Sequence, residues 1–77
     1  MQRLLSISEV ASTLGCSETS IGRQVKEGTM VKPVRVGRRV TFPSNEIYAI
    51  LTARIKGKSI QSIKRLATEL VEKRQEG

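Results

Sequence analysis

The segment SISEVASTLGCSETSIGRQVKEGTMVKPVRVGRRVTFP, residues 6–43, is the most informative part of this 77-residue chain. At its start, Ser6 is a good N-cap, and Glu9, three residues later, completes a capping box. Apolar residues then recur at helical spacing until Gly15, whose freedom to adopt a left-handed conformation suits a helix end. The pattern predicts a short helix over residues 7–14.

A second helix is predicted over residues 18–27, with Ser17 as its N-cap and Gly28 as its end. Its apolar positions are only Ile21 and Val25, one turn apart, and the rest of its surface is polar. Because this helix follows the first after a three-residue turn, we interpret the polar surface as a contact surface rather than a merely solvated one. The pair forms a helix-turn-helix, a motif that places its second helix in the major groove of DNA.

The next segment predicts a two-stranded hairpin around Gly37, because apolar and polar residues alternate on both sides of it. The register that gathers the apolar residues on one face opposes two pairs: Val36 with Val40, and Val34 with Phe42. This register leaves residues 37–39 as a three-residue loop. Four polar residues then face outward or occupy the tip: Arg35, Arg38, Arg39 and Thr41.

Two more helices are predicted after the hairpin. Pro43 and Ser44 open the third, which ends at Gly57 and has an apolar stripe of Ile47, Ile50, Leu51 and Ile55. Ser59 caps the fourth, whose apolar face comprises Ile60, Ile63, Leu66, Ala67, Leu70 and Val71. We therefore expect a mainly α chain with a small β-hairpin. Residues 1–56 would form a winged helix-turn-helix, and residues 57–77 a C-terminal helix that either packs on the thin core or forms an oligomer interface.

Positive charge is concentrated in two parts of the chain. The net charge is +7. Residues 23–39 carry six cations against one acid, and residues 54–65 carry five cations and no acid. A concentrated basic surface points to a polyanionic partner. Together with the helix-turn-helix and the basic hairpin, it makes double-stranded DNA the expected partner.

The chain lacks the residues that most enzyme and metal sites need. It has no histidine, no aspartate and a single cysteine, Cys16. A histidine base, an internal disulfide and a Cys/His zinc site are therefore excluded. We predict that the protein is not an enzyme and needs no metal or cofactor, and that Cys16 has a structural role. No apolar run approaches about 20 residues and no leader opens the chain, so we expect a cytoplasmic protein with no membrane partner.

Several segments together resemble the AlpA-like regulators and excisionases of phages and mobile elements, whose domain is a MerR-like winged helix. The resemblance extends to about Ile55 and is carried by residues 4–11 (LLSISEVA), 14–17 (LGCS), 26–28 (KEG), 32–43 (KPVRVGRRVTFP) and 44–47 (SNEI). Two positions depart from the family's pattern. Gly22 stands where a bulky residue, often Tyr, is usual, and Gln24 where an apolar or aromatic residue is common.

The resemblance implies a recognition helix over residues 17–26 and a wing that contacts DNA through Arg35, Arg38 and Arg39. The candidate contact residues of the helix are Ser17, Glu18, Thr19, Ser20, Arg23, Gln24 and Lys26, and those of the wing also include Thr41. Side-chain chemistry favours Arg23 for guanine and Gln24 for adenine. Ser17 and Lys26 suit phosphate, and the two arginines of the tip suit the neighbouring backbone or minor groove.

Three functions stay open at this point. The first is a sequence-specific transcriptional regulator of a prophage or mobile element, with RNA polymerase as a further partner. The second is an excisionase that bends attachment-site DNA and steers a recombinase toward excision. The third is an interaction module whose basic surface binds an acidic protein. Because one recognition helix reads few base pairs, we also expect a dimer or a cooperative oligomer on DNA, formed through the face of the fourth helix.

Overall fold

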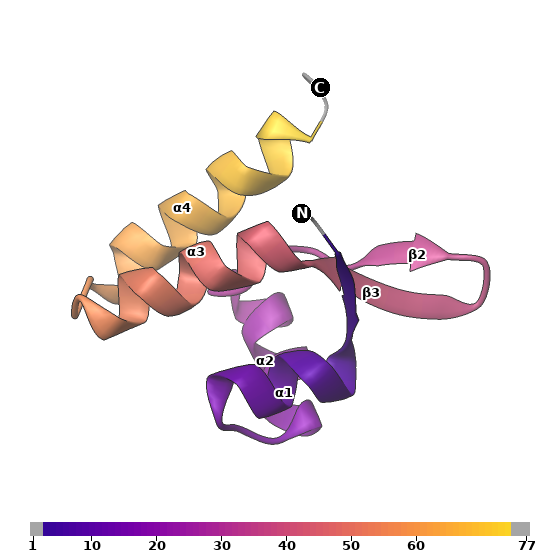
Figure 1. The fold of residues 1–77 in the computed structure, drawn as a ribbon. Coiled ribbons are helices and arrows are strands. Elements are labelled where there is room, and N and C mark those ends of the chain that lie inside the picture. The colour runs from indigo at the N-terminus through magenta and orange to yellow at the C-terminus, as the bar shows by residue number, and fades with distance from the viewer. Residues whose placement is uncertain (1–2, 75–77) are drawn as a thin grey trace.

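The computed structural model describes residues 3–74; residues 1–2 and 75–77, the ends of the two expected units, lie outside the described residues. Its elements are β1 (Leu4–Ser6), α1 (Ile7–Leu14), α2 (Glu18–Glu27), β2 (Val34–Val36), β3 (Arg39–Pro43), α3 (Ser44–Ile55) and α4 (Ile60–Lys73). The fold is mainly helical, with one three-stranded antiparallel sheet (Figure 1).

The first two helices begin and end where the sequence predicts. Ser6 Oγ accepts a hydrogen bond from the Glu9 N–H at 3.1 Å, and Glu9 Oε1 accepts one from the Ser6 N–H at 3.0 Å. Gly15 and Gly28 end α1 and α2 in the left-handed conformation, with φ of 70° and 85°. These local predictions are confirmed, and α1 packs against α2.

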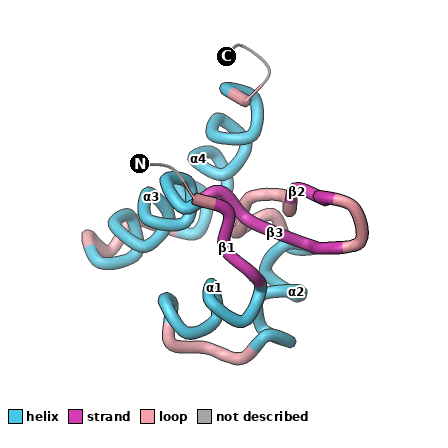
Figure 2. Tube along the Cα trace, turned by 45° about the vertical axis from the view of Figure 1, so that its right-hand side comes forward, coloured by secondary structure: helices cyan, strands magenta, loops and turns pink. Residues whose placement is uncertain are grey.

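The sheet contains a strand that the sequence did not predict. β1 pairs with β3, so that the strand order is β1-β3-β2, with Leu5 opposite Phe42. Both of these side chains are buried. β2 and β3 form the expected hairpin, which projects beyond the helices on the side opposite the α3–α4 turn (Figures 1 and 2).

The register of this hairpin differs from the predicted one. Val36 opposes Arg39 rather than Val40, so the loop has two residues, Gly37 and Arg38, instead of three. Gly37 has a φ of 61°, and no described residue other than glycine has a positive φ, which is the pattern of a type II′ turn. The prediction was wrong because it assumed that a buried face selects the register. Near the tip there is no such face, since Val36 is 49% exposed.

One hydrophobic core joins the helices and the sheet. Its buried apolar residues are Leu5, Val10, Ala11, Ile21, Met30, Val31, Phe42, Ile47, Ile50, Ala53, Ile63 and Ala67. Met30 and Val31 come from the loop between α2 and β2, where no helical or strand periodicity pointed to them. Ile55, the last residue of α3, was expected on the apolar stripe of this helix but is 76% exposed.

The apolar face of α4 belongs to the same core. Ile63 and Ala67 are buried, and three further residues pack against the core while partly buried: Leu66, Leu70 and Val71. Of the six residues expected at an oligomer interface, Ile60 alone stays largely exposed, at 66%. In this chain the face is therefore occupied by intramolecular packing, because a thin domain needs it to cover α3. Residues 57–59 are exposed and connect α3 to α4, which share this core.

Candidate nucleic-acid interface

α2 presents one polar face to solvent. On its inner side, Ile21 is fully buried and Val25 is partly buried against the core. The exposed residues of the helix are Glu18, Thr19, Gly22, Arg23, Lys26 and Glu27. We call the first five of these the α2 face. They form a single stripe, because residues three and four apart are neighbours on a helix surface.

The cations of the α2 face are available for an external partner. The ion pairs in the described part of the chain join Arg3 to Glu9 and Arg74 to Glu46. Neither pair uses Arg23 or Lys26. A guanidinium and an ammonium group that are both exposed and outside these pairs can bind phosphate or a base edge without giving up an ion pair.

The β2–β3 hairpin adds a second group of exposed cations. Arg35, Arg38 and Arg39 are all exposed, and two of them lie at the turn. The pKa of Glu9 on α1 is lowered, first by the hydrogen bond that its carboxylate accepts from the Ser6 backbone N–H and further by the positive charges of Arg3 and Arg39. Like Arg23 and Lys26, the three arginines of the hairpin take no part in the ion pairs of the described residues.

Gln24 has an internal partner that the sequence did not reveal. Its Oε1 accepts a hydrogen bond from Arg54 Nη2 on α3. A bidentate contact to adenine needs both the oxygen and the nitrogen of the amide to face the base. Here the amide is hydrogen-bonded to α3, so Gln24 links α2 to α3 in this structure, and its expected base contact requires the amide to turn away from Arg54. The sequence placed Arg54 only in a basic block, with no sign of this contact.

Two hydroxyl residues of the expected site also have internal roles. Thr41 is 5% exposed, and its Oγ1 donates a hydrogen bond to the Val34 carbonyl at 2.7 Å. The expectation that Thr41 faces outward to DNA was wrong, because Thr41 lies on the central strand of the sheet, flanked by Ser6 of β1 and Val34 of β2, and the sequence did not predict β1. Ser17 stays exposed but serves as the α2 N-cap, since its Oγ accepts from the Ser20 N–H and donates to Ser20 Oγ, both at 3.1 Å.

Within residues 3–74, no cluster of three or more histidine, cysteine, aspartate or glutamate side chains is placed to hold a metal ion. None of the described helices has the length and apolar character needed to cross a membrane. Comparison with protein-family models, with curated proteins and with solved structures finds no match for this chain.

Proposed function

We propose that this protein is a sequence-specific DNA-binding protein of the winged helix-turn-helix type that regulates transcription. The observation that carries the proposal is the α2 face. A short helix anchored by one fully buried residue, Ile21, exposes a continuous polar stripe with Arg23 at its centre and Lys26 at its end. The net charge of +7 supports the same partner, because DNA binding draws on neutralisation of phosphates.

In this proposal α2 enters the major groove through its N-terminal half. Arg23 suits guanine, to which a guanidinium donates two hydrogen bonds, and the Glu18 carboxylate suits the amino group of cytosine. Lys26, nearer the C-terminal end, suits a phosphate. Gln24 is left out of base readout, because its amide is held toward Arg54 of α3.

The β2–β3 hairpin acts as the wing. Arg38 and Arg39 project with it beyond the helices and suit the DNA backbone beside the groove that α2 occupies (Figure 1). Phosphate contacts hold the register of a protein on the duplex but carry no direct sequence code. The α2 face and the wing thus have different tasks, one reading bases and the other fixing position.

The role in transcription rests on the resemblance to AlpA-like regulators, and the same resemblance includes excisionases. A DNA-bending assay with circularly permuted fragments separates the two. Strong bending at several closely spaced sites, without RNA polymerase, would favour recombination over transcription.

The proposal is tested by selecting a binding site from a random duplex library and measuring affinity by fluorescence anisotropy over a range of salt concentrations. Contact with about 4–6 phosphates predicts a log-affinity against log-salt slope of about −4 to −5. A flat salt dependence, or failure to enrich any sequence, would refute it.

The division of tasks is tested on the selected duplex and on a scrambled one. Arg23→Ala is expected to weaken the selected site by about 1–3 kcal/mol and the scrambled one much less. Arg38→Ala is expected to weaken both equally. The control is Lys73→Ala, which removes one exposed charge from α4, outside both surfaces. Equal losses on the two duplexes for Arg23→Ala would remove that residue from base readout.

A further inference from the structure

A buried carboxylate lies where the hairpin joins α3. The side chain of Glu46, in the first turn of α3, is 4% exposed. It is bound by Arg74, whose Nε donates to Glu46 Oε1 at 3.1 Å and to Oε2 at 2.8 Å, while its Nη2 also donates to Oε1. An isolated buried charge is costly, so this geometry requires the guanidinium to stay in place.

The same guanidinium holds the other side of the hairpin. Arg74 Nη2 donates a hydrogen bond to the Lys32 carbonyl at 2.8 Å. Lys32 precedes the first residue of β2 by two positions, and Glu46 follows the last residue of β3 by three. One side chain at the end of α4 therefore contacts both chain segments from which the hairpin extends.

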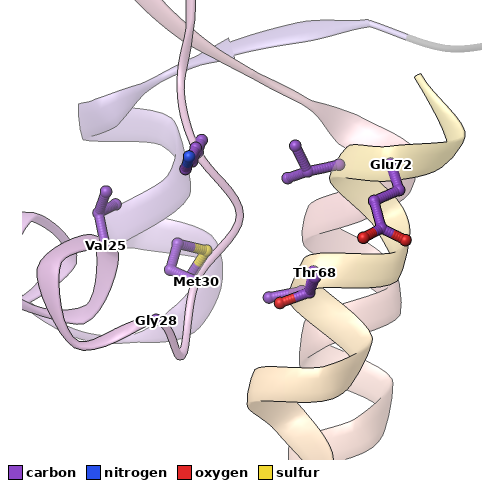
Figure 3. A pocket seen from close by; sticks show the side chains of 8 residues that line it. Val25, Gly28, Met30, Thr68 and Glu72 are labelled. Carbon is purple, nitrogen blue, oxygen red and sulfur yellow. The ribbon is translucent and has the colours of Figure 1, made fainter. Parts of the chain in front are cut away.

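Away from this contact, a pocket of about 290 Å³ separates α4 from the end of α2 and the loop that leads to β2 (Figure 3). Val25, Gly28 and Met30 line it on one side, and Thr68 and Glu72 of α4 on the other. Lys32 also lines this pocket, and its carbonyl is the atom that Arg74 binds. Arg74 thus connects the end of α4 to the loop before β2, two segments that the pocket otherwise keeps apart.

We propose that Arg74 is a positioning residue that holds the β2–β3 hairpin in the orientation in which it binds DNA. The inference rests on the proposed function and extends it to a residue outside the α2 face and the wing. A lysine cannot replace the arginine, because a single ammonium group does not reproduce the planar fork that serves Glu46 and the Lys32 carbonyl together. Loss of the fork frees the base of the hairpin while its own arginines stay intact.

The test is a double-mutant cycle between Arg74→Lys and Arg38→Ala, read as affinity for the selected duplex. Arg74→Lys alone is expected to weaken binding by about threefold to tenfold, and by less than about twofold once Arg38→Ala has already removed a wing contact. The matched control is Arg65→Lys, the same substitution at an exposed position of α4, which should leave affinity unchanged. Unchanged affinity for Arg74→Lys, or the same fold loss in both backgrounds, overturns the proposal.

Amide hydrogen exchange without DNA tests the same inference independently of DNA binding. In Arg74→Lys the amides of β2 and β3 should exchange faster, while those of α1 should keep their protection. If the single variant does not fold, Glu46→Met combined with Arg74→Met removes the buried charge and its partner together, an exchange that buried ion pairs often tolerate. Unchanged exchange of the hairpin in a folded variant overturns the positioning role. A wild-type protein that binds no duplex rejects the proposed function instead.

Discussion

Two isoleucines on one helix provide a direct measure of what α4 does. Ile63 is 8% exposed and belongs to the core, whereas Ile60, one turn earlier, is 66% exposed. The same substitution, isoleucine to alanine, can therefore be made at a buried and an exposed position of one element. The difference between their changes in unfolding free energy measures the effect of burial, because both variants gain a similar small amount of helix propensity.

The expected magnitudes differ severalfold. Truncating a buried isoleucine to alanine removes apolar contacts and leaves a cavity, and we expect Ile63→Ala to cost about 2–4 kcal/mol of unfolding free energy. For Ile60→Ala we expect a change within about 0.5 kcal/mol, as for most surface positions. A chain of this length has a total stability of about 4–12 kcal/mol. The buried variant would therefore lose a large part of it.

Thermal unfolding followed by circular dichroism, at several protein concentrations, is the assay. For a domain of this size, the loss expected for Ile63→Ala lowers Tm by at least about 8 °C. If α4 formed an oligomer interface instead, the wild-type Tm would rise with protein concentration and Ile63→Ala would abolish that rise. A concentration-dependent wild-type Tm, or equal effects of the two substitutions, would refute the conclusion that this face is core.

Three shorter predictions concern the other surfaces. Gly22→Ala should raise stability by about 0.5–1 kcal/mol, because a Cβ there meets no atom within 4 Å, yet it should weaken DNA binding measured by anisotropy if the α2 backbone approaches DNA closely. Thr41→Val should lower stability in urea unfolding by about 0.5–1.5 kcal/mol through loss of its bond to the Val34 carbonyl, and should leave DNA affinity unchanged. The pKa of Glu9 is lower in the folded protein than in the unfolded chain. Its contribution to the free energy of unfolding is therefore fully present above the unfolded-state pKa and is lost as the pH falls through the folded-state pKa. Glu9→Gln should therefore flatten the decline of Tm on acidification below the usual glutamate range.

The parts of the fold that the sequence predicted well are those set by neighbouring residues. The capping box joins Ser6 to Glu9, and Gly15 and Gly28 end their helices through their own backbone conformations. The exposed stripe of α2 also followed from the sequence, because two apolar residues one turn apart identify the inner side of a short helix and leave the rest outside.

The hairpin shows where sequence patterns fail. Alternation of apolar residues selects a register only where one face of the hairpin is buried, and near the tip Val36 and Val40 are both partly exposed. The turn chemistry of Gly37 decided instead, since a glycine with positive φ at the first position favours a two-residue loop. Thr41, an expected DNA contact, is instead a buried hydrogen-bond donor on the central strand, between Ser6 of β1 and Val34 of β2.

The helices, their ends, the position of the hairpin and the concentration of charge followed from the sequence, because these depend on residues a few positions apart or on composition alone. Which side chains are free to bind a partner depends instead on how the elements pack together. Gln24 meets Arg54 across 30 positions, and Arg74 meets Glu46 across 28. Such contacts form when distant elements pack together, and no local preference encodes the pairing. The same packing placed the apolar face of α4 against the core, whereas its periodicity was compatible with both packing and the oligomer interface that we expected.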